Sequence, residues 1–260
     1  MKLKTFAAVA LAAAAALSSV SMLARAEDKP AAAAAPAAAA VDLGKPDADG
    51  FFDLFNGKDL TGWEGQEGFW SVKDGAITAS EEKAKSRQTF LIWKGGNVSD
   101  FELRWKYKFV TKEGNSGVQF RSRVLDAKKD PYRVGGYQAD CDAGNTYTGI
   151  IYEEQGRGIL SKRGEKTHMT ADAKPKTEPL DKNNDEIKKL IKPSGEWNEC
   201  VLVAKGGHIV YSINGQVTTD LTDDSGKGAK DGILALQCHA GFTMEIQFKD
   251  IKYKPLGEKK

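Results

Sequence analysis

Apolar and polar residues alternate along most of the chain, which is the pattern of β-strands. In the segment 100–110, Phe101, Leu103, Trp105, Tyr107 and Phe109 alternate with polar residues, four of them charged. Successive side chains of a strand point to opposite faces, so this segment predicts a strand with one buried face and one face in water. Further stretches of strand-like sequence occur at 69–72, 76–79, 198–204, 208–213, 216–221, 232–240 and 242–253.

Glycine-containing turns separate several of these segments, at 74–75, 206–207 and 214–215. Such turns predict hairpins because glycine tolerates a positive φ. In the last segment, Ile246 and Phe248 are out of register with Ile251 and Tyr253, which predicts a β-bulge near 249–250. Many short strands joined by glycine-rich turns predict an all-β fold, either a β-sandwich or a jelly roll.

One helix is predicted, over 181–191, where Ile187, Leu190 and Ile191 share a side and Pro193 ends the segment. The preceding stretch, 165–180, is polar and contains two prolines. We expect it to be an excursion on the rim of the sandwich.

The N-terminal segment 1–26 has the features of a secretory signal peptide. Lys2 and Lys4 precede an apolar run, and the segment ends in Ala24-Arg25-Ala26, a small-residue cleavage site. An Ala/Pro-rich linker over 27–49 and a single domain over 50–257 follow. This organisation predicts a periplasmic or secreted protein.

The charge and the apolar content of the chain limit the classes of partner that it can bind. The chain has 38 Lys and Arg against 36 Asp and Glu, and signal cleavage removes Lys2, Lys4 and Arg25, which leaves 35 against 36. The mature chain therefore has no basic excess to attract nucleic acid or anionic lipid. No segment after the signal peptide approaches the ~20 apolar residues of a membrane-spanning helix. We expect neither nucleic acid nor membrane as a partner; the oligomeric state is left open.

Three cysteines, Cys141, Cys200 and Cys238, occupy apolar strand positions. None belongs to a CxxC pair, which excludes a zinc ribbon. Two alternatives remain: three buried free thiols, or one disulfide with one thiol left over.

Three predicted strands combine an apolar face with an unusual polar face. A face that only met water would favour Lys, Glu and Thr, whereas these faces carry Arg, Gln, Asp and His. Such a set is typical of the floor of a cleft for a polyhydroxylated ligand. The strands contribute Gln119 and Arg121; Gln138, Asp140 and Asp142; and Gln237 and His239.

An ordered set of motifs over about 50–256 resembles the 3-keto-disaccharide hydrolase family, also described as 3-keto-glucoside-1,2-lyase/3-keto-2-hydroxy-glucal hydratase. The chain departs from the commoner family wording, Tyr-Glu-hydrophobic-Gln, at 137–140, so the substrate subtype stays open. The motifs are FDLFNGKDLTGW at 52–63, GNSGV at 114–118, GYQAD at 136–140, TG at 148–149 with YEE at 152–154, GEWN at 195–198 and LQCH at 236–239.

The resemblance implies a concanavalin A-like jelly-roll β-sandwich and a small-molecule glycoside or oligosaccharide as substrate. It implies cleavage of 3-keto-glycosides by removal of the C2 proton, β-elimination at C1 and hydration. Such chemistry needs a base, a group that stabilises the enolate oxygen, and an acid for the leaving oxygen.

Three residues are expected to be catalytic. His239 is the first choice for the base or a metal ligand, and Glu154 is a candidate acid. Asp140 is a candidate for binding sugar hydroxyls, for a general base or for a metal ligand. A structural histidine, a strand-end carboxylate and an ion pair with a nearby arginine are the respective structural alternatives. The three residues together would suit a divalent ion, although no local spacing demands one.

Further residues are expected to bind substrate. Arg121 would polarise the C3 carbonyl or enolate, unless it forms a cross-strand salt bridge. Trp93, at a strand end, would stack on a sugar at the rim, whereas Trp105 is expected in the core. The remaining candidates are Gln138, Tyr152, Gln237 and Arg163.

Two other functions compete with the enzyme suggested by the resemblance. A carbohydrate-binding module of the same fold would bind sugar without catalysis. An ordinary retaining glycosidase would need two carboxylates ~5–5.5 Å apart, but the E-x-D-x-x-E strand pattern of laminarinase-type enzymes is absent.

Overall fold

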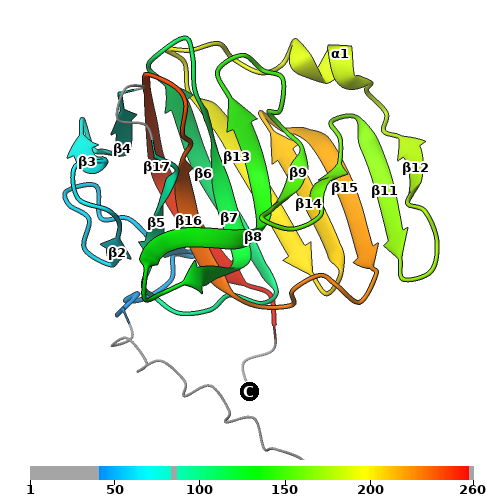
Figure 1. The fold of residues 1–260 in the computed structure, drawn as a ribbon, viewed down its shortest axis with the longest axis horizontal. Helices are drawn as coiled ribbons and strands as arrows, with labels where there is room; N and C mark the ends of the chain where they lie inside the picture. The colour runs from blue at the N-terminus through cyan, green and yellow to red at the C-terminus, as the bar shows by residue number, and fades with distance from the viewer. Residues whose placement is uncertain (1–40, 83–86, 258–260) are drawn as a thin grey trace, which may run out of the picture. The chain divides into compact units, whose positions relative to one another are not determined.

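A computed structural model of the protein describes residues 41–82 and 87–257. The predicted signal peptide and most of the predicted linker lie outside these residues. The described chain forms two β-sheets and one short helix, α1 (Asn184–Lys188), as Figure 1 shows. The predicted all-β sandwich with one short helix is therefore confirmed. Within the described ranges, no helix is both long and apolar enough to cross a membrane.

The larger sheet has ten strands. Its order is β12 (Lys176–Pro179), β11 (Glu165–Thr170), β15 (Gln216–Asp224), β14 (His208–Ile213), β13 (Asn198–Lys205), β6 (Phe101–Phe109), β17 (Met244–Pro255), β4 (Ala76–Glu81) and β3 (Trp70–Lys73), with β1 (Phe52–Asp53) paired to β17.

The smaller sheet has seven strands and carries the site described below. Its order is β10 (Gly158–Ser161), β9 (Ile151–Glu154), β8 (Asp130–Asp142), β7 (Asn115–Asp126), β16 (Ile233–Cys238), β5 (Thr89–Trp93) and β2 (Trp63–Glu64).

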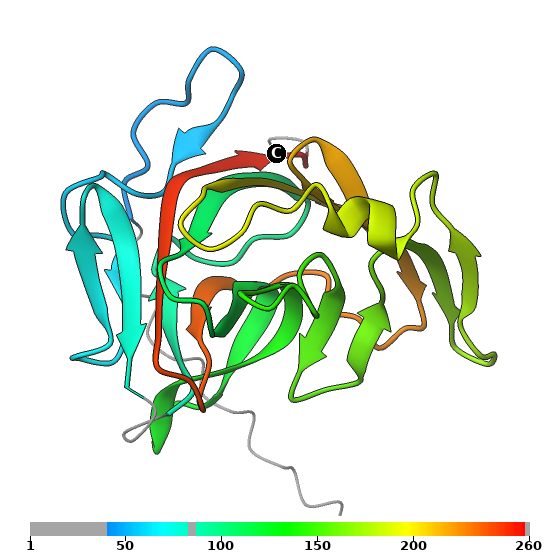
Figure 2. The same cartoon turned by 90° about the horizontal axis from the view of Figure 1, so that it is seen from above.

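The two sheets face each other across one main hydrophobic core (Figure 2). Leu103 and Leu202 of the larger sheet pack in the same cluster as Val118 and Phe120 of the smaller sheet. Trp105 lies in this core, as expected, with its ring stacked on Tyr211 at a centroid distance of 5.7 Å. The alternation in the sequence thus places the apolar side chains in the space between the two sheets.

Local predictions about turns and register are also confirmed. The β3–β4 turn places Asp74 at φ 51° and Gly75 at φ 69°, the left-handed region that a tight hairpin needs. The pairing of β17 with β6 shifts between Lys249 and Lys252, and Asp250 has φ 52°. This shift is the predicted bulge, and it returns Ile251 to the buried side.

Two segments differ from their predictions. The helix spans five residues only, and Leu190, expected on its buried side, is 41% exposed. The stretch 165–180 forms two strands, and β11 pairs in parallel with β15. Every residue of β12 is exposed, so no hydrophobic alternation marks this edge strand in the sequence.

Candidate active site

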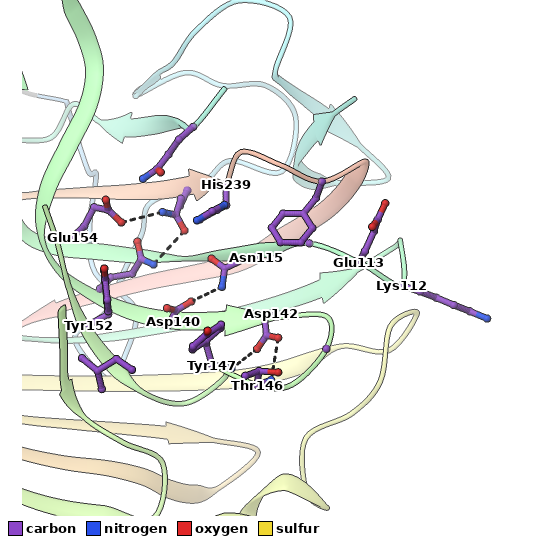
Figure 3. Close-up of a pocket in the computed structure, with 17 residues that line it drawn as sticks. Lys112, Glu113, Asn115, Asp140, Asp142, Thr146, Tyr147, Tyr152, Glu154 and His239 are labelled. Atoms are coloured by element: carbon purple, nitrogen blue, oxygen red, sulfur yellow. Dashed lines mark hydrogen bonds between the residues drawn. The ribbon is translucent and has the colours of Figure 1, made fainter. Parts of the chain in front are cut away.

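A cavity of about 730 Å³ opens on the outer face of the smaller sheet, the face turned away from the main core (Figure 3). Its floor comes from β7, β8, β9 and β16. Its walls come from the loops that join β6 to β7, β8 to β9, and β16 to β17. The lining includes Asn115, Gln138, Asp140, Tyr152, Glu154, Gln237 and His239, together with Gln88, Asp142, Tyr147, Ile159 and Phe242.

Strand pairing explains why polar side chains gather on this face. Gln119 of β7 is opposite Gln138 of β8, and Gln138 is opposite Tyr152 of β9. Directly paired residues project to the same face. Because Val118 and Phe120 point into the core, Gln119 between them points outward. Its cross-strand partners Gln138 and Tyr152 therefore also point outward.

Three buried glutamine amides form a hydrogen-bonded chain beneath the cavity. Gln119 Nε2 donates to Gln138 Oε1 at 2.7 Å, and Gln138 Nε2 donates to Gln237 Oε1 at 3.2 Å. Gln237 Nε2 then donates to Glu154 Oε2 at 3.5 Å, and Ser122 Oγ donates to Gln119 Oε1 at 2.7 Å. A carboxylate only accepts hydrogen bonds, so every amide in this chain presents its NH₂ group toward Glu154. We call these four residues, Ser122 with the three glutamines, the amide chain.

Gly117 makes room for the amide chain. A Cβ atom at this position would lie 2.7 Å from Gln138 Cγ and 2.8 Å from the Ala139 carbonyl oxygen. Real Cβ atoms do not approach neighbours so closely. The glycine therefore allows the Gln138 side chain to lie across β7 and to reach Gln237 on β16.

Asp140 is the most deeply buried acid of the cavity, with 6% of its surface exposed. Burial raises its pKa well above the ordinary value, and the nearby charges of Asp142 and Glu154 raise it further. A hydrogen bond from Asn115 Nδ2 to its Oδ1, 3.3 Å long, opposes this shift without cancelling it. A raised pKa suits a proton donor better than a general base, which was one of the roles expected for Asp140.

Glu154 and His239 face the same cavity. Glu154 Oε1 accepts from Gln155 Nε2 at 2.9 Å, while its Oε2 accepts from the amide chain. His239 Nδ1 lies 2.7 Å from the Ala240 carbonyl oxygen. A carbonyl oxygen only accepts, so Nδ1 carries the hydrogen, and Nε2 of the neutral ring keeps its lone pair.

The loop between β8 and β9 is held from two sides. Asp142 accepts the backbone N–H groups of Thr146, Tyr147 and Thr148 at 2.7–3.0 Å. Arg163, 5% exposed, donates to Asn145 Oδ1 and to the Asn145 and Thr148 carbonyl oxygens. Arg163 thus lies outside the cavity that it was expected to line. Its contacts position the loop that carries Tyr147.

Two further expectations are wrong. Arg121 was expected beside Gln119, but the β7–β8 register shifts after Phe120 and Arg121 takes φ 46°. This irregularity turns the Arg121 side chain away from the cavity. The guanidinium instead donates to Asp100 and to the carbonyl oxygens of Ser99 and Gly206.

Trp93 was expected to stack at the rim, yet it is 3% exposed and packs in the main core. Alternation explains this position, since Leu91 and Trp93 share the inner face of β5 while Phe90 and Ile92 share the outer one. The inward position of Trp93 could therefore be read from the alternation in β5. The register shift at Arg121 could not, because a one-residue irregularity leaves no such pattern in the sequence.

Several lining residues were missed by sequence reasoning. Tyr147 stands alone in a glycine- and threonine-rich loop, Phe242 follows β16, and Ile159 lies on the edge strand β10. An aromatic residue inside a polar turn is the one available signal, and it applies to Tyr147. In contrast, Gln138, Tyr152 and Gln237 line the cavity as expected.

The metal alternative finds no geometric support. Within 41–82 and 87–257, no three His, Cys, Asp or Glu side chains are grouped so that they could hold a metal ion. His239, Asp140 and Glu154 therefore share the cavity without forming a metal-binding cluster.

Comparison with known proteins agrees with this architecture. A solved structure of a candidate glycosyl hydrolase from Parabacteroides distasonis has a TM-score of 0.52 at 21% identity, covering 81% of this chain and 95% of that one. A Bacillus subtilis protein of unknown function with a galectin-like fold has a TM-score of 0.51 at 12% identity, covering 75% and 90%. These likenesses establish the β-sandwich fold.

Fold and site together define a β-sandwich protein with a polar cavity on the outer face of its smaller sheet, and the family match adds that it is carbohydrate-active. Residues 50–254 match the model of the 3-keto-alpha-glucoside-1,2-lyase-like domain, and the chain belongs to that family. A 3-keto-disaccharide hydrolase of Bacteroides thetaiotaomicron is 24% identical over 180 residues, which are 65% of this chain. The match spans 57% of that relative's length.

Proposed function

We propose that this protein cleaves 3-keto-glycosides by elimination at C1–C2 followed by hydration, with net hydrolysis as the outcome. The carrying observation is one cavity that combines a buried carboxyl whose pKa is raised by burial, a histidine whose Nε2 keeps its lone pair, and a carboxylate that accepts a hydrogen bond from the amide chain. Membership of the 3-keto-alpha-glucoside-1,2-lyase-like family supports this chemistry. With the predicted signal peptide, we place the reaction in the periplasm or outside the cell.

The elimination uses two of these groups. In a 3-keto-glycoside the C2 proton is acidic because it lies next to the C3 carbonyl. His239 Nε2 removes that proton, and the C–H electron pair forms an enolate with the carbonyl. The enolate then restores C3=O and forms C1=C2 as the C1–O bond breaks, while Asp140 gives its proton to the leaving oxygen.

Hydration returns both groups to their starting states. Asp140, now a carboxylate, removes a proton from a water molecule that adds to C1. His239, now protonated, returns a proton to C2. Burial also raises the pKa of Tyr152, whose hydroxyl therefore stays a donor for sugar oxygens. Glu154 is assigned to the sugar hydroxyls, because its carboxylate accepts hydrogen bonds and faces the cavity.

The first test follows aglycone release from a 3-keto-glucoside and from its unoxidised parent. We expect release from the keto sugar only, slowed when C2 carries deuterium in place of hydrogen. His239→Gln and Asp140→Asn should each lower kcat/KM by ~10²–10⁴-fold. Release from the parent glucoside, without an isotope effect at C2, would instead establish an ordinary glycosidase.

Sugar binding without catalysis is the second candidate function. The amide-rich floor of the cavity favours it, since side-chain amides both donate and accept hydrogen bonds and can therefore pair with sugar hydroxyls. This candidate is favoured if neither sugar is cleaved while calorimetry still detects binding. It also predicts that His239→Gln leaves the affinity for glucosides unchanged.

A further inference from the structure

An apolar bank borders the polar floor of the cavity on the side of β9 and β10. The described residues include four exposed large hydrophobic side chains: Val110, Tyr147, Ile159 and Leu190. Two of these four, Tyr147 at 48% and Ile159 at 45% exposure, line this one cavity. Single exposed apolar residues need no explanation, but their convergence on a cavity does.

The bank is continuous across two strands. Ile159 of β10 is the direct cross-strand partner of Tyr152 of β9, so their side chains are neighbours on the same face. Tyr147 contributes from the β8–β9 loop, close to Asp142 and Asp140 in Figure 3. We call Tyr147, Tyr152 and Ile159 the apolar bank.

We propose that the apolar bank binds an aromatic aglycone of the glycoside substrate. This inference rests on the proposed function, which makes Asp140 the acid for the leaving oxygen. Tyr147 belongs to the loop that begins beside Asp140, whose carbonyl accepts the Gly149 N–H. A group leaving from C1 toward Asp140 therefore lies against the bank, while C2 and C3 face His239. The cavity of about 730 Å³ falls in the ~300–1,000 Å³ range of sites for drug-sized ligands.

An aromatic group fits the bank better than a second sugar does. Ile159 offers no hydrogen bond, and each tyrosine offers an aromatic ring with a single hydroxyl. Aromatic pairs favour such contacts beyond the area they bury. A second sugar ring would leave several hydroxyls without protein partners on this side.

Calorimetry with unoxidised phenyl and methyl glucosides, of both anomers, tests this assignment without any turnover. We expect the phenyl glucoside to bind about tenfold more tightly than the methyl glucoside of the same anomer. The double variant Tyr147→Ser/Ile159→Ser should reduce that ratio to about two or less and leave the methyl glucoside affinity unchanged. Leu190→Ser, at an exposed apolar residue outside the cavity, is the matched control and should keep the wild-type ratio.

The outcomes separate the two proposals. If the ratio of phenyl to methyl glucoside affinity is the same in wild type and double variant, the aromatic subsite is overturned, whatever the catalytic result. Equal or tighter binding of a disaccharide, weakened by the double variant, would assign the bank to a second sugar instead. Failure to cleave any keto sugar, with the expected ratio intact, overturns only the catalytic proposal. If no glucoside binds, the aromatic subsite is overturned, and the catalytic proposal is judged by cleavage of the keto sugar alone.

Discussion

The pKa of Asp140 is raised by surroundings that single substitutions can change. Burial has the largest effect on its pKa, and the charge of Asp142, two residues along the same strand, has the next. A proton donor with a raised pKa keeps its proton to higher pH than an ordinary carboxyl. The proposed elimination should therefore slow when the pH rises through the pKa of Asp140.

Asp142→Asn is the residue-scale prediction. The variant keeps an oxygen for the Tyr147 and Thr148 N–H groups but gives up the oxygen that accepts the Thr146 N–H. It also loses the negative charge, so the pKa of Asp140 falls. The alkaline decline of kcat/KM for a 3-keto-glucoside should then move to lower pH, and in Asp140→Asn that decline should vanish. Asp126→Asn, at the far end of β7, is the control. An alkaline decline that stays in place in Asp142→Asn, or moves equally in the control, would contradict the assignment.

At the scale of elements, one guanidinium ties the β8–β9 loop to α1. Arg163 Nε donates to Asn184 Oδ1 at 3.0 Å, and its Nη atoms bind the loop at Asn145 and Thr148. The planar fork of arginine serves acceptors in several directions at once. A lysine ammonium at this position would leave buried carbonyl oxygens without a donor.

Arg163→Lys should accordingly lower the free energy of unfolding by ~1–3 kcal/mol. Because the loop carries Tyr147, KM for an aryl keto-glucoside should rise several-fold while kcat changes little. Urea unfolding and steady-state kinetics measure the two effects. Arg133→Lys, at an exposed arginine that donates to Gln155, should change neither. A lowered kcat with an unchanged KM would show that Arg163 does more than position the loop.

The strands that alternate strictly were predictable, whereas the irregular positions were not. β6, β13 and β14 follow hydrophobic periodicity, and the polar faces of β8 and β16 lie where the alternation places them. β11 and β12 are polar edge strands, so nothing in their residue pattern records the pairing. The expectation for Arg121 was wrong for a related reason, since one extra residue in β7 turns its side chain to the opposite face of the sheet.

At the scale of the whole molecule, a cluster of charges joins the two sheets. Arg157, which follows β9, pairs with Glu153 at 2.7 Å and with Asp223 of the larger sheet at 2.8 Å. Tyr137 of β8 donates to the same Asp223 carboxylate. Burial alone would raise the pKa of Asp223, but hydrogen bonds from Arg157, Ser225 and Tyr137 outweigh it and lower the pKa to about 2.

Asp223→Asn is the prediction at this scale. A carboxyl with a lowered pKa stabilises the fold above its unfolded pKa of ~4, and this stabilisation is lost as the pH falls through about 2. The variant should lose ~2 kcal/mol of unfolding free energy at neutral pH. The difference from wild type should shrink as the pH falls from ~4 toward the folded pKa.

Urea unfolding across this pH window measures the difference. Asp224→Asn changes the neighbouring, exposed carboxylate that pairs with His168, and it should stay within ~0.5 kcal/mol of wild type. An Asp223→Asn variant with the same pH dependence as wild type would mean that the cluster does not hold the sheets together.

All three cysteines are free thiols and fully enclosed, Cys141 in β8, Cys200 in β13 and Cys238 in β16. Burial raises the pKa of each thiol, so the reactive thiolate is suppressed as long as the strands stay closed. A thiol reagent can therefore modify them only during openings of the chain. The rates at which such a reagent labels the three thiols therefore measure how often each sheet opens, Cys141 and Cys238 for the smaller sheet and Cys200 for the larger one. The native cysteines serve as the probes.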